Sequence, residues 1–455
     1  MTHSDIIIIG GGPGGMDTAA EASRRGFTVT LFEAAEIGGT CLNAGCIPTK
    51  ALVRNAEVLS EFKSAERFGI DNFTFEFDFD KVMERKNNVV AQLRQGAESV
   101  LQTAKVNVVK AYASFKDSKT VVTADGEEYT ADDIIIASGS VSRSLPIPGA
   151  DLDCVMDSTS ILNIDHIPES LTIIGGGVIG MEFASIFNAF GSHVTVVEFM
   201  KQILPPFDSD IAKRLKQNLS KQGIEILTQA AVTGISQTAD GEIVTTYECK
   251  GKQGEVRSSD ILMAVGRMPN TKGLNLAAAG IEANQRNGAI IVDADMRTNV
   301  PHIYAIGDAN GGVMLAHVAT FEGIRALNAI QGKNDEIDFS IIPSAVFTSP
   351  ECGMAGLTSD QCKEKGIAVK TGTAFYRANG KAMAMDETDG LCKLLFSAED
   401  EKLLGVHIMG AQAADIAQQA AGLMARGTTR EQLCDIIFSH PTVSELLHNA
   451  AHNVK

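Results

Sequence analysis

Short aliphatic runs that stop abruptly at glycine recur along the chain and form its clearest pattern. Runs of this length, bounded by glycine, are typical of strands that are buried on both faces of a parallel sheet. They lie at residues 5–9, 133–137, 171–174, 260–265 and 302–306. Because helix-like stretches come after several of them, the pattern predicts an α/β fold.

Two of these runs begin two copies of one motif, which lie 165 positions apart, from Gly10 to Gly175. Each copy has three glycines at G-x-G-x-x-G spacing, and these are Gly10, Gly12, Gly15, Gly175, Gly177 and Gly180. In each copy a helix-like stretch and a β-branched strand come next, and the strands end at Glu33 and Glu198. A single motif of this kind is weak evidence, but a repeat with strand, helix and acid in the same order predicts two dinucleotide-binding domains.

The residue types in this motif suit a dinucleotide. The first glycine permits a tight turn, the second lets the backbone approach the pyrophosphate, and the third lets the helix pack on the strand. The pyrophosphate meets the positive end of the helix, and the terminal glutamate accepts hydrogen bonds from the ribose. Asp308 comes after the run at residues 302–306, at the strand end where ligands bind in α/β sheets, and we expect it to contact a second cofactor.

Composition excludes several partners. The chain has 455 residues, of which 44% are hydrophobic and 21% charged, so we expect about three soluble domains. A net charge of −17 argues against a nucleic acid or an anionic membrane as partner. No apolar run approaches the roughly 20 residues of a membrane span, and the first residues lack the features of a signal or transit peptide. We therefore expect a cytoplasmic protein.

The segment GGTCLNAGCIPTK brings Cys41 and Cys46 close together, whereas the other cysteines are scattered singly. In a regular helix these two residues would lie about 7.5 Å apart along the axis, too far for a disulfide, so we expect Asn43 and Gly45 to supply an irregularity. Cys46 is expected near a helix N-terminus, with Lys50 one turn further on, and both features favour a thiolate. No additional ligands at zinc spacing accompany the pair, so we predict redox chemistry and no metal.

Thiol–disulfide exchange leaves a thiolate that must be protonated or held. The segment SHPTVSE offers His440 as a proton donor, with Glu445 available to orient its ring. A histidine before a proline near a C-terminus is more often structural when taken alone, but beside a redox pair we interpret it as an acid–base group. His317 has no such partner, and we interpret it as a helix-start residue near the cofactor.

With these segments the chain resembles the flavoprotein disulfide reductases, the family of lipoamide dehydrogenase and glutathione reductase. The resemblance covers essentially the whole sequence and rests on both glycine motifs, the cysteine segment, YAIGD and HPTVSE. It implies an α/β fold with two Rossmann-like dinucleotide-binding domains, for FAD and NAD, and a C-terminal α+β interface domain. The implied divisions are an FAD domain at 1–148, an NAD domain at 149–271, a return to the FAD domain at 272–341 and an interface domain at 342–455.

Carried over position by position, the resemblance assigns the first copy to FAD and the second to the nicotinamide nucleotide. The implied FAD contacts are Gly10, Gly12, Gly15, Glu33, Gly39, Thr40, Lys50, Ala113, Ser138, Gly139, Asp308, Met314, Leu315, Ala316 and His317. The implied nicotinamide nucleotide contacts are Gly175, Gly177, Gly180, Glu182, Glu198 and Gly266.

The resemblance also implies catalytic roles. Lys50 would pair with Glu182 near the flavin. Cys46 would face the flavin, and Cys41 would exchange with the substrate. His440 and Glu445 would reach the site from the other subunit of a homodimer, so that the active sites are shared.

Details within the family favour the lipoamide dehydrogenase branch. The segments RANGKAMAMDETDGLCKL and VMLAHVATFEG resemble that branch, and Glu198 without a following arginine favours NAD over NADP. Three departures stand out. Phe438 occupies the position of a usual additional histidine, Ser138 replaces a usual threonine, and AYASF at residues 111–115 has alanines where glycines are usual near the adenine.

We therefore predict that the protein oxidises dihydrolipoamide with NAD⁺, and that the dithiol is the lipoyl group of an acyltransferase or a similar carrier. An NADH-dependent reductase of another disulfide or oxidant would share every residue except the substrate pocket and is the alternative. A flavin-binding scaffold without turnover is disfavoured by the intact cysteine pair with Lys50 and His440.

Overall fold

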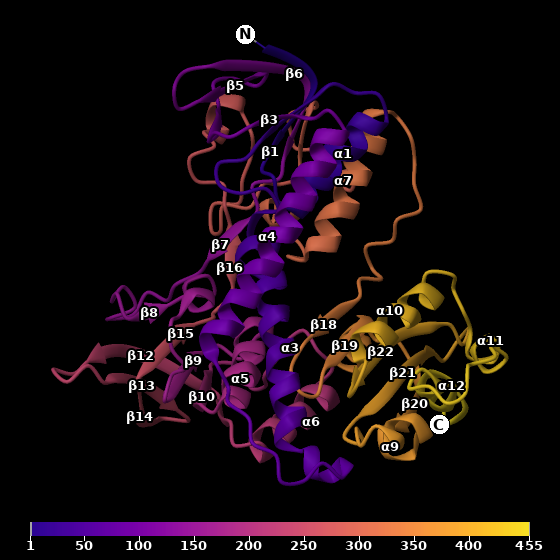
Figure 1. Ribbon diagram of the computed structural model, residues 1–455. Helices are drawn as coiled ribbons and strands as arrows, with labels where there is room; N and C mark the ends of the chain where they lie inside the picture. The colour runs from indigo at the N-terminus through magenta and orange to yellow at the C-terminus, as the bar shows by residue number, and fades with distance from the viewer. Residues whose placement is uncertain (1, 455) are drawn as a thin grey trace.

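The N-terminal region is built on a seven-stranded sheet in a computed structural model that describes residues 2–454. Its parallel part has the order β3-β2-β1-β6, with β17 on the other side of β6. The strands are β1 (Thr2–Ile9), β2 (Val29–Phe32), β3 (Asn107–Val109), β4 (Ala113–Phe115), β5 (Thr120–Thr123), β6 (Glu128–Ile136) and β17 (Ile303–Ala305). Ile6, Ile7 and Ile8 have no exposed surface, because helices α1 (Pro13–Arg24) and α7 (Ala316–Ile330) cover one face and the β4–β5 hairpin closes the other (Figure 1).

A second sheet, entirely parallel, comes next in the chain with the order β11-β10-β9-β15-β8. Its strands are β8 (Val155–Met156), β9 (Ser170–Ile174), β10 (His193–Glu198), β11 (Glu225–Thr228) and β15 (Asp260–Met263). The helices of this region are α5 (Val178–Phe190) and α6 (Ser209–Lys221), and an antiparallel meander is formed by β12 (Ala230–Gln237), β13 (Ile243–Cys249) and β14 (Lys252–Ser258). The two motif copies therefore begin equivalent βαβ units in separate sheets.

A two-stranded ribbon joins these regions. The chain leaves the first sheet through β7 (Ser140–Ser142) and returns through β16 (Arg267–Pro269), and the two strands pair antiparallel. After β16 the chain adds β17 to the first sheet. The second region is thus an insertion in the first.

The C-terminal region is an antiparallel sheet with the order β18-β19-β22-β21-β20. Its strands are β18 (Ser344–Val346), β19 (Cys352–Gly356), β20 (Val369–Phe375), β21 (Leu391–Ser397) and β22 (Leu403–Met409). Its helices are α8 (Ser359–Glu364), α9 (Gly380–Ala384), α10 (Ala413–Met424), α11 (Arg430–Cys434) and α12 (Glu445–His452). The predicted fold class, two Rossmann-like units and an α+β domain, is confirmed.

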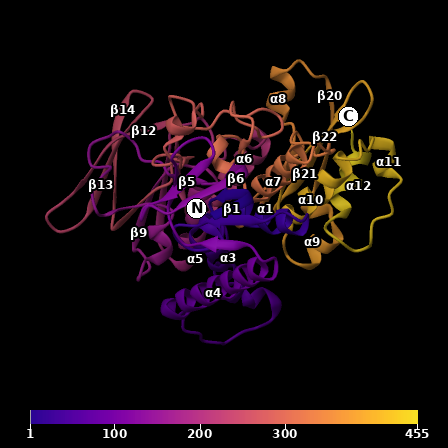
Figure 2. The ribbon, with the colours of Figure 1, turned by 90° about the horizontal axis from the view of Figure 1, so that it is seen from above.

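Two neighbouring helices, α3 (Cys46–Lys63) and α4 (Phe79–Thr103), carry the first region toward the second, and α3 packs on α5 (Figures 1 and 2). The short helix α2 (Gly39–Ala44) immediately precedes α3. Within residues 2–454 no helix combines the length and the apolar character that crossing a bilayer requires.

Candidate active site

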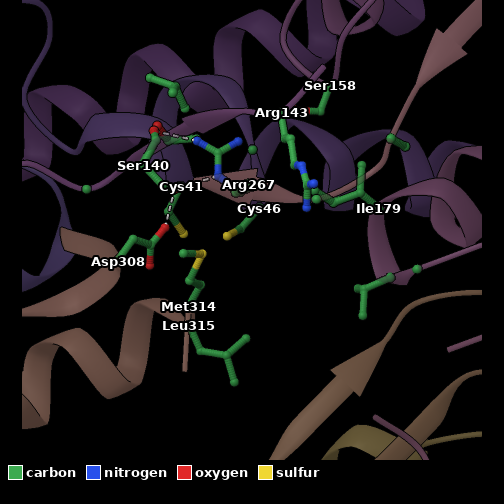
Figure 3. A pocket seen from close by; sticks show the side chains of 18 of the residues that line it. Cys41, Cys46, Ser140, Arg143, Ser158, Ile179, Arg267, Asp308, Met314 and Leu315 are labelled. Atoms are coloured by element: carbon green, nitrogen blue, oxygen red, sulfur yellow. Dashed lines mark hydrogen bonds between the residues drawn. The ribbon is translucent and has the colours of Figure 1, made fainter. Parts of the chain in front are cut away.

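A cavity of about 1600 Å³ runs between the two parallel sheets and holds most of the residues that the sequence singles out. Its volume exceeds the roughly 300–1,000 Å³ of an ordinary small-molecule site, which suits two dinucleotides rather than one. The predicted residues in its lining are Gly10, Gly12, Glu33, Gly39, Thr40, Cys41, Cys46, Lys50, Ser138, Gly139, Gly175, Gly177, Glu182, Glu198, Gly266, Asp308, Met314, Leu315 and Ala316. Figure 3 shows side chains from both regions pointing into this space.

The turns after β1 and β9 have the same backbone geometry. Gly10 has φ +112° and Gly175 has φ +109°, values that side chains other than glycine rarely adopt. A Cβ at either position would also lie 2.2 or 2.3 Å from a carbonyl oxygen of the neighbouring strand end. These glycines are therefore required by the tight turn.

Three of the remaining motif glycines have surroundings that require or suit the absence of a side chain. A Cβ on Gly15 would lie 1.9 Å from the carbonyl oxygen of Gly10, so this glycine lets α1 approach β1 closely. Gly180 has the same role in the second copy, at 2.0 Å from the Gly175 carbonyl. A Cβ built on Gly177 would have no atom within 4 Å. This open space leaves room for a ligand at the positive end of α5.

Glu33 and Glu198 end their strands beside these turns. The carboxylate of Glu33 accepts a hydrogen bond of 2.7 Å from the Gly11 N–H, and that of Glu198 accepts one of 2.5 Å from the Gly176 N–H. Both also lie in the cavity lining. The carboxylates are therefore held at the edge of the turn, where the motif requires an acceptor for a ribose.

Gly45 breaks the chain between α2 and α3, with φ −152° and ψ −108°, and so separates the two cysteines as the spacing predicts. Cys46 is the first residue of α3, and both thiols are free. A hydrogen bond between the two thiols, with the positive charge of Lys50, lowers the pKa of Cys46 to about 7. The same contact and burial raise the pKa of Cys41, so of the two thiols Cys46 has the lower pKa.

Lys50 and Glu182 form the expected ion pair, with the Lys50 ammonium 2.8 Å from both carboxylate oxygens. The pair joins α3 to α5, and the Glu182 side chain is only 4% exposed. Glu182 also accepts a 3.0 Å hydrogen bond from the Phe347 N–H, while the ammonium of Lys50 lies 4.8 Å from the centre of the Phe347 ring. A positive charge is thus fixed one helical turn from Cys46.

A chain of hydrogen bonds that sequence reasoning missed holds Asp308. Arg267 donates from Nε to the Ser140 hydroxyl and from Nη2 to the Ser140 carbonyl, both at 2.7 Å, and the hydroxyl in turn donates to Asp308 (Figure 3). The sequence feature that could have indicated these hydrogen bonds is Arg267, which comes directly after Gly266. Arg143, also missed, lines the same cavity (Figure 3).

The residues assigned to FAD fit that group. The hydroxyl of Ser138 and the side-chain carbonyl of Asn43 line the cavity, are buried, and have no hydrogen-bond partner among the described residues. Unsatisfied buried polar atoms are rare and indicate a ligand that completes them. The N-terminus of α1 faces the same space and suits a pyrophosphate.

Six predicted site residues lie outside the lining of this cavity, and two of them are Gly15 and Gly180, which face the turns described above. Ala113 is buried in β4 at 3% exposure, and the ring of His317 contacts the Pro343 carbonyl oxygen at 2.9 Å, on the exposed surface of α7. His440 and Glu445 form the expected pair, with 3.0 Å between the ring Nδ1 and the carboxylate, but belong to the C-terminal domain. A single chain therefore brings the thiols to the nucleotide turns and leaves this histidine elsewhere.

Metal ligation has no support in the geometry. No group of three or more His, Cys, Asp or Glu side chains within residues 2–454 is arranged to hold a metal ion. The cysteine pair stands beside a lysine instead.

Comparison with known proteins agrees with this geometry. A sequence model of the pyridine nucleotide-disulphide oxidoreductases matches residues 4–323, and the dimerisation domain of the same family matches residues 342–451. The chain is 38% identical to dihydrolipoyl dehydrogenase of Geobacillus stearothermophilus over 453 residues, which cover 99% of this chain and 96% of that relative. It is 37% identical to the mitochondrial dihydrolipoyl dehydrogenase of Pisum sativum over 456 residues, covering 99% and 91%.

A solved structure is similar over its full length as well. The HOCl-induced flavoprotein disulfide reductase RclA from Escherichia coli superposes with a TM-score of 0.88 at 31% identity, covering 99% of this chain and 100% of that chain. The shared family carries the use of FAD and NAD(H), which the two turns and the thiol pair accommodate. The chain thus belongs to the pyridine nucleotide-disulphide oxidoreductases and is an FAD- and NAD(H)-dependent oxidoreductase that acts on sulfur groups.

Proposed function

We propose that the protein is a dihydrolipoamide dehydrogenase, which converts dihydrolipoamide and NAD⁺ to lipoamide, NADH and a proton. The observation that carries this proposal is the position of Cys41 and Cys46 in one cavity with both nucleotide turns. Relatives at 37% and 38% identity that bear the name dihydrolipoyl dehydrogenase support the substrate.

In this reaction the chain's own residues handle sulfur and protons. A thiolate of the substrate attacks Cys41 of the Cys41–Cys46 disulfide, and Cys46 leaves as a thiolate. The second substrate thiol then displaces Cys41, which releases the oxidised substrate. The depressed pKa of Cys46 and the charge of Lys50 stabilise the leaving thiolate.

FAD, when bound, carries the electron pair from the reduced cysteines to NAD⁺. The residues that would hold it are those of the first turn, Ser138 and Asp308, and the second turn with Glu198 would hold NAD⁺. Arg267 and Ser140 fix the Asp308 carboxylate at the end of its strand. We assign Glu182 to keeping Lys50 beside the thiols.

The proton that the substrate thiols release is assigned to His440 of the other subunit in a homodimer. The match of residues 342–451 to the family's dimerisation domain supports a dimer. The His440 side chain is 77% exposed and is oriented by Glu445, whose pKa is lowered by the Thr442 N–H and by His440. An exposed, oriented histidine is suited to exchange a proton with the thiols of a neighbouring chain.

Subunit mixing tests the shared site. Hybrid dimers of His440→Gln and Cys41→Ser chains contain one site with both lesions and one with neither, so activity returns if the sites are shared. Alone, His440→Gln is expected to slow thiol exchange by about 10²–10⁴-fold, the usual range for a lost acid–base group. Verified hybrids that stay inactive would place His440 in the site of its own chain.

The substrate itself is tested by following NADH production from NAD⁺ and dihydrolipoamide, with Cys46→Ser as the inactive control. Turnover with free dihydrolipoamide and faster turnover with a lipoylated carrier domain are expected. If NADH reduces the flavin but lipoamide compounds give no turnover, the dithiol assignment is wrong.

The second candidate is an NADH-dependent reductase of another disulfide or oxidant, and Phe438 favours it. This residue replaces a histidine that is usual in the lipoamide branch, and its ring packs 5.8 Å from that of His448. The likeness to RclA, whose name is that of an HOCl-induced disulfide reductase, supports the same candidate. NADH-dependent reduction of a panel of disulfides in the absence of lipoamide turnover would select it.

A further inference from the structure

One wall of the nicotinamide end of the cavity is the segment 199–207, which leads from Glu198 to α6. Phe199, Met200, Pro205, Pro206 and Phe207 of this segment line the cavity. Its course is fixed at its start by a 2.5 Å hydrogen bond from the Met200 N–H to Glu198. In its middle the Leu204 N–H donates to the carbonyl of Gly176, inside the nucleotide turn itself, at 2.8 Å. A backbone hydrogen bond therefore joins the segment to the turn.

Asp208 directly follows this segment, and its carboxylate contacts residues of the C-terminal domain. Its side chain has no exposed surface and lies 2.9 Å from the ammonium of Lys393, on β21. Its second oxygen accepts a 2.9 Å hydrogen bond from the Ser359 N–H at the start of α8. Asp208 also caps α6, through the N–H of Asp210 at 3.1 Å. One carboxylate thus connects the cavity wall, a helix of the nucleotide domain and two elements of another domain.

The ion pair itself is buried, and further ionisable groups surround it. Lys393 is 8% exposed at its side chain and has a second carboxylate partner, Asp210, at 2.6 Å. His407 lies opposite Lys393 on β22, is fully buried, and contacts the Leu357 carbonyl through Nε2 at 2.9 Å, while its Nδ1 has no partner among the described residues. Burial lowers the pKa of His407, so the histidine is neutral and Lys393 is the cation that balances Asp208.

The other polar contacts between α6 and the C-terminal domain are at the surface, whereas Leu215 and Leu219 of α6 share a buried apolar cluster with Leu391 and Met409. Asn218 reaches Asp389 at 3.0 Å, and Gln222 reaches the Ser349 carbonyl at 2.8 Å. Exposed polar contacts contribute little to fixing one geometry, whereas a buried pair that loses one partner leaves an uncompensated charge and disfavours every arrangement without the pair. The Asp208–Lys393 pair is therefore the buried charged contact that joins this end of the wall to the C-terminal domain.

We propose that Asp208 and Lys393 are positioning residues for NAD(H), which hold the wall 199–207 and, through Leu204, the second nucleotide turn in the binding geometry. The C-terminal domain, matched as a dimerisation domain, thereby sets the affinity of the nicotinamide site. The thiol site lies on α2 and α3, and the cavity lining around it includes neither Asp208 nor Lys393.

The test separates the two half-reactions of the purified holoenzyme. Anaerobic rapid mixing with NADH gives an apparent Kd for NADH from flavin absorbance, and dithiothreitol reports on the thiol side. In Lys393→Met the Kd for NADH is expected to rise about tenfold, with the limiting rate of flavin reduction and the dithiothreitol rate within twofold of the unaltered protein. Lys370→Met, which removes an exposed partner of Glu401 in the same domain, is the matched control and should change none of these.

Asp208→Asn guards against a folding defect, because asparagine caps a helix as well as aspartate and can still accept from Ser359. It should raise the Kd for NADH in the same direction by a smaller factor. Adding it to Lys393→Met removes the unpaired buried charge and should recover part of the affinity. An unchanged NADH Kd in both single variants, or an equal slowing of both half-reactions, overturns the proposal. Neither readout depends on which disulfide is the natural substrate.

Discussion

The two nucleotide-binding regions agree closely up to the glutamate that ends the second strand, and they differ in the segments beyond that glutamate. In the first region the Gly38 N–H donates to the carbonyl of Gly11 at 2.8 Å, and in the second the Leu204 N–H donates to the equivalent Gly176 carbonyl at the same distance. Both donors have positive φ, at +95° and +47°. Each turn is thus tied to the segment after its glutamate.

Beyond that shared contact the two segments have different uses. After Gly38 the first leads within a few residues to α2 and the cysteine pair. After Leu204 the second leads to Asp208 and the C-terminal domain. The repeated motif therefore fixes a nucleotide in both regions, whereas the segment after the glutamate decides which chemistry or which domain stands beside it.

Replacing the first glycine of each copy is expected to show the largest difference between the two regions, because each change should affect a different cofactor. Gly10→Ala places a Cβ 2.2 Å from the Ala137 carbonyl oxygen and should yield protein without FAD, and so with activity lowered by more than about 10²-fold. Gly175→Ala should retain FAD and instead raise the Kd for NADH by about 10²-fold. Flavin content and flavin reduction by NADH measure the two outcomes.

Gly191→Ala is the control for this pair, since Gly191 also has φ +113° but its Cβ would meet no atom within 4 Å. It should keep both cofactors. If Gly10→Ala and Gly175→Ala both lost FAD, the two turns would not bind separate dinucleotides.

A smaller effect is expected from replacing Glu198, the glutamate of the second copy. Glu198 is 6% exposed, and no arginine comes directly after it, so it should exclude a 2′-phosphate. Glu198→Arg should shift the ratio of kcat/KM for NADH over NADPH by roughly 10–10²-fold toward NADPH. Flavin content should not change, because Glu33 serves the other copy. Equal kcat/KM for both nucleotides in the unaltered protein would contradict the role of Glu198.

The smallest expected effect concerns the thiols that only the first copy has. A pKa of about 7 at Cys46 means that its thiolate is formed as pH rises through that value. In Cys41→Ser, whose hydroxyl can still donate to Cys46, a long-wavelength absorbance beside FAD should therefore increase with pH around a midpoint near 7. Cys46→Ser should show no such absorbance at any pH. The opposite pattern would exchange the assignments of the two thiols.

Sequence periodicity, glycine spacing and the spacing of the cysteines predicted the two βαβ units and an irregularity at Asn43 and Gly45, because backbone constraints of this kind are local. The order of the domains came from the resemblance alone. The contacts that remained hidden join distant segments. Nothing in the spacing shows that Arg267, Ser140 and Asp308 meet, or that Asp208 meets Lys393, since these depend on how separate strands end and how domains pack.

Two assignments from the resemblance also show where position alone is insufficient. Ala113 lies inside an antiparallel hairpin and is covered by the core, and His317 is turned toward the Pro343 carbonyl by the first turn of α7. A residue's place in a motif does not determine the direction of its side chain. The roles of both therefore stay predictions.

The β7–β16 ribbon has a consequence for engineering. Because the strands that enter and leave the nicotinamide domain lie side by side, a short loop from Ser142 to Arg267 could replace the intervening residues while the first sheet keeps all of its strands. Insertions with adjacent ends tolerate such excision. The shortened chain would need Lys393 replaced by an apolar residue, because the excision removes Asp208 from beside it. The enzyme is in this sense an FAD-binding protein with an inserted nicotinamide domain that can be removed.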